Sequence, residues 1–118
     1  MAISITTPSP GKFGFIINAT SADASGCEIL KAAPAAGLSI VVEHLTINNG
    51  ANAINVTIGQ GVAGGAVETA LIGAIAMAAN SSLQWDFLQG MVLTAAKSLT
   101  VDTSGAGNIC IFACGRVQ

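Results

Sequence analysis

Residues 38–49 read LSIVVEHLTINN, and their alternation of apolar and polar residues decides the fold. Leu38, Ile40 and Val42 share one parity, whereas Leu45 and Ile47 share the other. A regular strand would place these two sets on opposite faces of a sheet, because successive side chains alternate. One extra residue near Glu43 and His44 would return both sets to the same face. The stretch therefore predicts a half-buried strand with a β-bulge at that point.

Similar short strands are predicted on both sides of this stretch. The upstream segments are FGFII (13–17) and EIL (28–30), and the downstream ones are INVTI (54–58), LQWDF (83–87), MVL (91–93), LTVDT (99–103) and ICIFAC (109–114). β-Branched and aromatic residues dominate them, and glycine-rich or asparagine-rich turns separate several of them. We expect a hairpin turn at residues 48–52. Because residues 109–114 are apolar at both parities, we expect that strand to be buried on both faces.

Residues 67–79 are compatible with a helix or a strand. Their alanines favour a helix, and the segment is long enough for about three turns. Gly73 weakens a helix, and Leu71, Ile75 and Met77 share one parity, which favours a strand. With this segment extended, the chain has about eight or nine short strands. We therefore predict an all-β fold, an antiparallel β-sandwich or jelly roll.

The sequence PSPG at residues 8–11 separates a short apolar-polar segment from the rest of the chain. We interpret residues 1–11 as an N-terminal arm and residues 12–118 as a single β-sandwich domain. The arm could reach a neighbouring molecule, or it could form an ordinary first edge strand followed by a turn. If it makes contacts, we expect Ile3 and Ile5 to make them.

Composition excludes several kinds of partner. Charged residues make up 8% of the 118 residues, against about 25% in an ordinary soluble domain. The hydrophobic fraction of 52% argues against disorder. Four cations form no basic patch, so nucleic acid is not an expected partner. A membrane is not expected either, because a spanning helix needs about 20 consecutive apolar residues. The N-terminus also lacks the basic and apolar regions of a signal peptide.

The charge count also predicts assembly. A folded monomer of 11.7 kDa should expose about 5,900 Å². Four basic and six acidic residues leave about one charge for every 590 Å², near the size of the largest apolar patch on a typical monomer. Part of this surface is therefore expected to contact protein.

No catalytic, cofactor or metal site is predicted, and we do not expect an enzyme. Residues 59–64, GQGVAG, match the dinucleotide-binding pattern G-x-G-x-x-G, but no series of crossover helices accompanies them. His44 is the only histidine, and the six carboxylates are scattered singly. A zinc site would need all three cysteines together with His44. Trp85, at strand spacing from Leu83 and Phe87, is interpreted as a core residue.

From Gly37 onward the chain resembles small virion proteins of tailed bacteriophages, above all capsid decoration (cement) proteins with a jelly-roll fold. The resemblance rests on short sequence patterns that are typical of the fold: GLSIVV (37–42), LTINN (45–49), VTIG (56–59), GMVLT (90–94), KSLTV (97–101) and SGAGNI (104–109). It implies a β-sandwich that assembles as a homo-oligomer, often a trimer, and binds the major capsid protein. It carries no catalytic residues.

The resemblance implies a structural protein that decorates and stabilises a capsid. Its location would be the virion surface, after synthesis in the host cytoplasm without a signal peptide. Another tail, fibre or base component of the virion and a surface or glycan-binding module are the alternatives. Our candidate interface residues are Ile3, Ile5, Cys110 and Phe112, the last two on a face of their strand that a partner would bury.

Overall fold

A computed structural model describes residues 4–6, 14–21, 28–61, 67–105 and 108–118, which form nine strands and contain no helix. The strands are β1 (Ser4–Thr6), β2 (Phe15–Ser21), β3 (Glu28–Lys31), β4 (Ile40–Asn49), β5 (Ile54–Gly61), β6 (Val67–Met77), β7 (Ser82–Val92), β8 (Ser98–Thr103) and β9 (Ile109–Val117). Residues 67–77 are thus a strand, as their alternation predicted. No helix among the described residues is long and apolar enough to cross a membrane.

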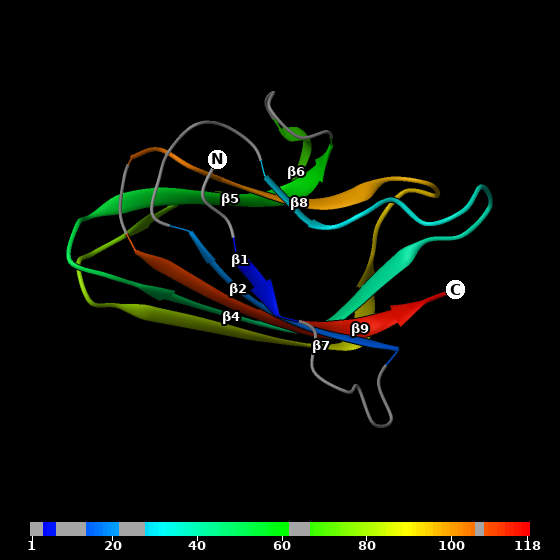
Figure 1. The fold of residues 1–118 in the computed structure, drawn as a ribbon, viewed down its shortest axis with the longest axis horizontal. Coiled ribbons are helices and arrows are strands. Elements are labelled where there is room, and N and C mark those ends of the chain that lie inside the picture. Colours follow the sequence, from blue (N-terminus) through cyan, green and yellow to red (C-terminus); the bar gives the residue numbers. More distant parts are fainter. Residues whose placement is uncertain (1–3, 7–13, 22–27, 62–66, 106–107) are drawn as a thin grey trace.

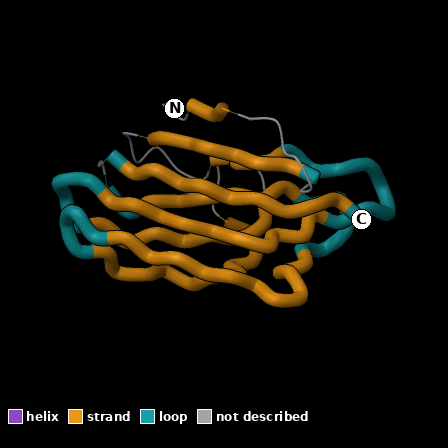
Figure 2. Tube along the Cα trace, turned by 90° about the horizontal axis from the view of Figure 1, so that it is seen from below, coloured by secondary structure: helices purple, strands orange, loops and turns teal. Residues whose placement is uncertain are grey.

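The strands form two antiparallel sheets that pack face to face (Figure 1). The five-stranded sheet has the order β1-β2-β9-β4-β7, which Figure 2 shows from its outer side, and the four-stranded sheet has the order β3-β8-β5-β6. Strand β2 pairs with β9, β3 with β8, β4 with β7 and β5 with β6. This nested pairing of first strand with last is the arrangement of an eight-stranded jelly roll. The predicted fold class is confirmed.

Strand β1 is added to this jelly roll at the edge of the five-stranded sheet. Ser4 lies opposite Thr20, and Thr6 lies opposite Asn18 on β2. Within one chain, the segment therefore forms the first edge strand, which was one of its two predicted states. Contact of the arm with a neighbouring molecule stays a prediction.

The predicted bulge in β4 is confirmed. Val42 lies opposite Gly115 of β9 and His44 lies opposite Cys114, so Glu43 is the extra residue of β4. The bulge returns Leu45 to the side of the sheet that faces the core, where Val42 already lies. The change of parity in the sequence thus has a physical cause, the need to bury both halves of one strand against one core.

The hairpin predicted at residues 48–52 is wrong, because β4 and β5 belong to different sheets. The Asn49 side chain explains how the chain crosses between them. Its amide nitrogen donates to the backbone oxygens of Asn52 at 2.8 Å and Ala78 at 3.0 Å. The buried amide thereby ties the β4–β5 connection to the β6–β7 connection. Asn49 and its neighbours form an inter-sheet corner whose local composition is also typical of a hairpin turn.

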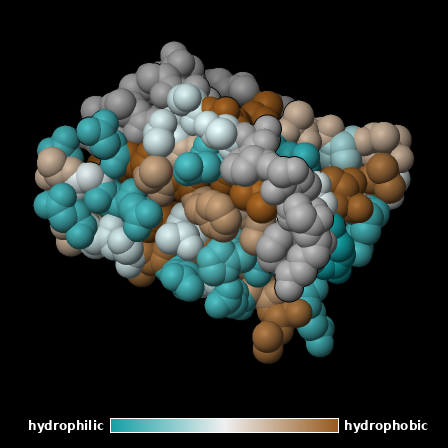
Figure 3. Space-filling model, turned by 60° about the horizontal axis from the view of Figure 1, so that its bottom comes forward, coloured by the Kyte–Doolittle hydropathy of each residue, from teal (hydrophilic) through white to brown (hydrophobic). Residues whose placement is uncertain are grey.

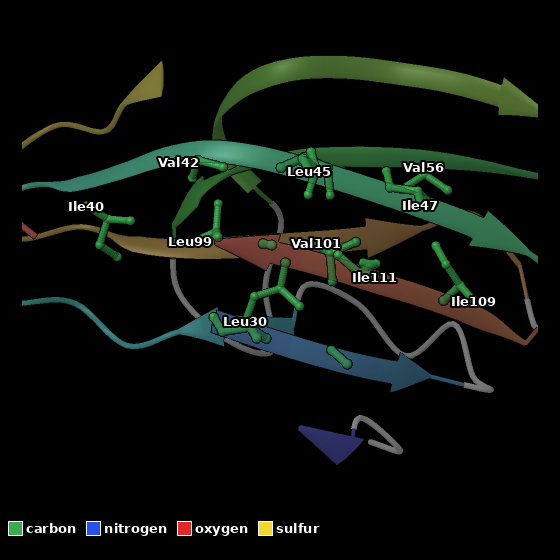
Figure 4. Packing of buried hydrophobic residues seen from close by; sticks show 14 of the residues in the cluster. Leu30, Ile40, Val42, Leu45, Ile47, Val56, Leu99, Val101, Ile109 and Ile111 are labelled. Atoms are coloured by element: carbon green, nitrogen blue, oxygen red, sulfur yellow. The ribbon is translucent and has the colours of Figure 1, made fainter. Parts of the chain in front are cut away.

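The core lies between the two sheets, and Figure 4 shows its central side chains. Leu45 and Ile47 of β4 face Val56 and Ile58 of β5 within one cluster, and all four are fully buried. At one end of the sandwich the buried Gln60 receives a hydrogen bond of 2.9 Å from the Thr94 backbone and donates one of 2.8 Å to the Thr94 hydroxyl. These bonds satisfy a polar side chain that would otherwise be costly to bury.

Burial of β9 on both faces was predicted, and the structure corrects this. Ile109, Ile111 and Ala113 are buried in the core. Phe112 is 38% exposed and Cys110 is partly exposed, because their parity directs them to the outer face of the five-stranded sheet.

Candidate protein interface

The predicted interface residues do not form one surface. Ile3 lies outside the described residues. Ile5 lies opposite Ala19, a core residue, so it is on the inner side of the five-stranded sheet, at its rim, and is 40% exposed. Cys110 and Phe112 lie on the outer side of the same sheet. The structure therefore brings Cys110 and Phe112 together but separates them from Ile5.

Uncharged polar residues surround Phe112 on the outer face. Its register partners are Asn18 on β2 and Thr46 on β4, and those of Cys110 are Thr20 and Asn48. Figure 3 shows this side of the molecule, where hydrophobic patches lie between hydrophilic and near-neutral residues. The centre of the face is thus polar without charge, a surface that costs less to dehydrate than one carrying ions.

The charged and titratable groups of this face gather around the β4 bulge. The Glu43 carboxylate accepts a hydrogen bond from the Arg116 guanidinium, and the His44 Nδ1–H donates to the Asp86 carboxylate. The Thr46 hydroxyl is 3.2 Å from Nε2 of the same ring and donates to it when the ring is neutral. His44 also meets Phe112 edge to face, with 6.0 Å between ring centroids. Each of these carboxylates thus has a hydrogen-bond donor close to Phe112.

Cys114 lies opposite His44 and is buried among these groups. Burial raises the pKa of the Cys114 thiol above its ordinary value of 9.0, and the negative charges of Glu43 and Asp86 add to the effect. A thiol held in its protonated form is a poor nucleophile at neutral pH. The Asp86–His44–Cys114 row therefore lacks the activated thiolate that a cysteine nucleophile requires.

The raised pKa of Cys114 predicts a loss of stability in alkali. Because the thiol ionises more readily in the unfolded chain, its contribution to stability is complete below pH 9.0 and declines as the pH rises further. Urea denaturation between pH 7 and 10 should show a steeper alkaline decline for the natural chain than for Cys114→Ala. Cys110→Ala serves as the control, and equal slopes for the natural chain and Cys114→Ala would contradict the assignment.

A second candidate surface is the side of the sandwich formed by the edge strands β6 and β7, which we call the β6–β7 flank. Among the described residues, every partly buried hydrophobic side chain packed against the core comes from these two strands: Leu71, Ile72, Ile75, Leu83, Trp85, Phe87 and Met91. Trp85 contacts the core as predicted, but it is only partly buried. The core is incompletely covered along this flank, which is typical of a surface that another chain covers.

Strand β7 carries a feature that we did not predict from the sequence. Asp86 pairs with His44 and Met91 pairs with Val42, so four residues of β7 lie between two pairs that enclose only Glu43 on β4. Residues 87–90 therefore bulge out of the ladder. Leu88, within this bulge, is 100% exposed. The local signal is the break in alternation at residues 87–88, followed by Gly90. We call residues 87–90 the Leu88 bulge.

Gly90 is required by the geometry of the Leu88 bulge. Its φ is +83°, and a Cβ added to it would lie 2.2 Å from Cγ1 of the buried Val41. Gly90→Ala should lower the free energy of unfolding by about 1–3 kcal/mol, from backbone strain and overpacking together. In a urea double-mutant cycle, Val41→Ala should relieve the clash but leave the strain. If the losses in the free energy of unfolding of Gly90→Ala and Val41→Ala simply added up in the double variant, the contact between Gly90 and Val41 would be contradicted.

The surface of the four-stranded sheet is hollowed at one end. A shallow depression of about 420 Å³ is lined by Ala53, Ile54, Asn55, Ala76, Met77, Ala78 and Ser104. A smaller one of about 160 Å³ shares Asn55 and Ser104 with it and includes Asp102. Apart from Asp102 in the smaller depression, these linings are uncharged.

The pattern G-x-G-x-x-G does not begin with a phosphate-binding turn. Gly59, Gln60 and Gly61 form the end of β5, where Gly59 pairs with Thr100 and Gln60 with Leu99 of β8. Residues 62–64, the rest of the pattern, lie outside the described residues. Within the described ranges, no three His, Cys, Asp or Glu residues gather in a way that could hold a metal ion.

Comparison of the chain with protein families, with curated proteins and with solved structures gave no match.

Proposed function

We propose that this chain is a structural virion protein that decorates and stabilises a bacteriophage capsid by binding the major capsid protein as a homotrimer. The observation that carries the proposal is an open hydrophobic flank on a charge-poor jelly roll. The partly buried β6–β7 flank and the exposed Leu88 are surfaces that association would cover. The sequence stretches from Gly37 onward that resemble decoration proteins support a capsid as the particular assembly.

The mechanism is thermodynamic. A protein that binds the assembled shell, but not its separated subunits, stabilises the shell by mass action. The gain grows with the free protein concentration relative to the dissociation constant, and every occupied position on the shell adds to it. The outer face around Phe112 and the β6–β7 flank offer two separate surfaces, one for other copies and one for the capsid.

Apolar contacts, not ion pairs, supply the affinity in this proposal. Four basic and six acidic residues are too few to steer binding, and Arg116 and His44 already contact carboxylates within the chain. Raising sodium chloride from 0.1 to 1 M shortens the Debye length from about 10 to about 3 Å. Attachment should therefore survive this change, and sedimentation of particles with bound protein measures it. Release of most of the protein would contradict an apolar attachment.

The location in the particle tests the proposal directly. Gold-labelled antibody against this chain, applied to purified virions that contain it, should label the whole head surface under the electron microscope. Labelling confined to the tail or base would support the alternative structural role. Absence of the chain from purified virions would overturn both, and the native mass of the isolated protein tests the trimer separately.

A further inference from the structure

We propose that Asn49 is a site of spontaneous deamidation that the folded chain protects, and that a chain which loses this amide while unfolded cannot refold. The inference goes beyond the proposed function and does not depend on it.

Asn49 and Gly50 form the only Asn-Gly pair in the sequence. In such a pair the backbone nitrogen of the glycine loses its proton and attacks Cγ of the asparagine. The new N–Cγ bond closes a succinimide ring, the Cγ–Nδ2 bond breaks, and ammonia leaves. Water then opens the ring to aspartate or to isoaspartate, in which the side-chain carbon has joined the main chain. Glycine favours the attack because no side chain shields its nitrogen or restricts its backbone.

The folded chain holds the Asn49 amide away from this reaction. The residue is 7% exposed and ends β4, where its backbone N–H donates to Ser81 at 2.8 Å. Its Nδ2 donates to the backbone oxygens of Asn52 at 2.8 Å, Ala78 at 3.0 Å and Met77 at 3.4 Å. In a strand the next backbone nitrogen lies along the chain, whereas the side chain stands perpendicular to the sheet. Attack therefore requires this corner to open first.

The fold requires both residues of the pair. Asn49 ties together the β4–β5 and β6–β7 connections, which lie at the left end of the sandwich in Figure 1. Gly50 lies against Asn108, because a Cβ added to it would be 2.7 Å from the Asn108 backbone oxygen and 3.0 Å from its Cβ. The Gly50 backbone oxygen also accepts a hydrogen bond of 2.7 Å from Asn80. A larger residue at position 50 would slow the reaction only by disturbing the corner.

The product of the reaction does not suit the same corner. The Asn49 side chain donates to three backbone oxygens, and within the described residues its Oδ1 accepts no hydrogen bond. An ionised carboxylate has no proton to donate, so it would lie buried against carbonyl oxygens, where a charge without a donor is costly. Isoaspartate would in addition lengthen the main chain where Asn49 pairs with Ile109. Modification of the unfolded chain is therefore an irreversible loss of the folded state.

Peptide mapping by mass spectrometry measures the protection. The natural chain is incubated in native buffer and in unfolding urea at the same mildly alkaline pH. Loss of the Asn49 amide should be at least about tenfold slower in native buffer, because it proceeds only through opened molecules. Ala53→Gly is the matched control, since it makes the exposed Asn52 the first residue of a second Asn-Gly pair. Folding should slow that pair much less. Equal rates at Asn49 in the two buffers, or equal protection of both pairs, would overturn the proposal.

Refolding after ageing measures the consequence in the natural chain itself. Samples are held in urea for increasing times and then diluted, and size exclusion with Trp85 fluorescence separates refolded from unfolded chains. The refolded fraction should contain only the amide form at residue 49, and the unfolded fraction should accumulate the aspartate and isoaspartate forms. Modified chains in both fractions in equal proportion would overturn the proposal.

Two variants separate the added charge from the lost hydrogen bonds. Asn49→Asp and Asn49→Ala both remove the Nδ2 donor, but only the first adds a carboxylate. Burial among acceptors should raise the pKa of that carboxyl in the folded chain. Its cost is then complete above this raised pKa and disappears as the pH falls to about 3.9, the ordinary value. The urea midpoint of Asn49→Asp should lie below that of Asn49→Ala at neutral pH, and the gap should close on acidification. Equal midpoints at neutral pH would contradict the proposal, and the refolding test decides it if neither variant folds.

Discussion

Gly115→Ala should be among the most damaging single substitutions in the chain, with a loss of about 4 kcal/mol or more in the free energy of unfolding. A Cβ at this position would lie 1.9 Å from the backbone oxygen of Val41 and 3.1 Å from Cα of Val42. Both atoms belong to the β4 backbone just before its bulge, where Glu43 is the extra residue. Relief of the clash would require moving the central pairing of β4 with β9, since no flexible side chain can yield instead.

Gly73→Ala is the matched control for this substitution. Gly73 also lies within a strand, but a Cβ there would have no heavy atom within 4 Å. Its replacement should change stability by less than about 1 kcal/mol, and in the stabilising direction if the unfolded chain loses freedom. Urea denaturation followed by the fluorescence of Trp85, the only tryptophan, measures both variants. Similar midpoints for the two would show that β4 does not approach Gly115 this closely.

The bulge that creates this constraint was predictable, because a change of parity within one apolar stretch has few structural explanations. The same alternation identified β6 as a strand despite its alanines. In each case the signal is local: the side chains of one strand must reach one core. The fold class follows from adding such segments together.

The partners of each strand were not predictable in the same way. Asparagine and glycine at residues 48–52 suit a hairpin, but the Asn49 amide donates to Ala78 and to Met77, which are 29 and 28 residues away. Contacts of this kind decide whether the chain after a turn remains in one sheet or crosses to the other. The composition of the turn itself does not reveal them. The nested jelly-roll pairing became visible only in three dimensions.

The candidate interface was predicted least well for a related reason. Ile5 and Phe112 are both exposed apolar residues, but they lie on opposite sides of one sheet. Leu88 was not predicted because its exposure results from a mismatch in register, in which four residues of β7 stand against one of β4. Sequence periodicity assigns residues to faces of a regular strand, and it fails where the strand leaves its ladder.

Ile47→Ala should lower the free energy of unfolding by about 2–5 kcal/mol, because a fully buried side chain would leave a cavity between the sheets. Its direct partner across β4 and β7 is Leu83, which is only partly buried on the β6–β7 flank. Leu83→Ala removes a similar volume, yet in the isolated chain it should cost about half as much or less, since water can reach the space that it leaves.

The comparison between these two neighbours also measures whether the flank is covered. If another copy packs against β6 and β7, Leu83 becomes part of a buried interface and the cost of Leu83→Ala should rise with protein concentration. The cost of Ile47→Ala, a residue already enclosed by its own chain, should stay the same over that range. Urea midpoints measured over a hundredfold range of concentration separate these cases. Parallel curves for both variants would mean that the flank stays exposed to water, which would contradict its use in contacts between copies.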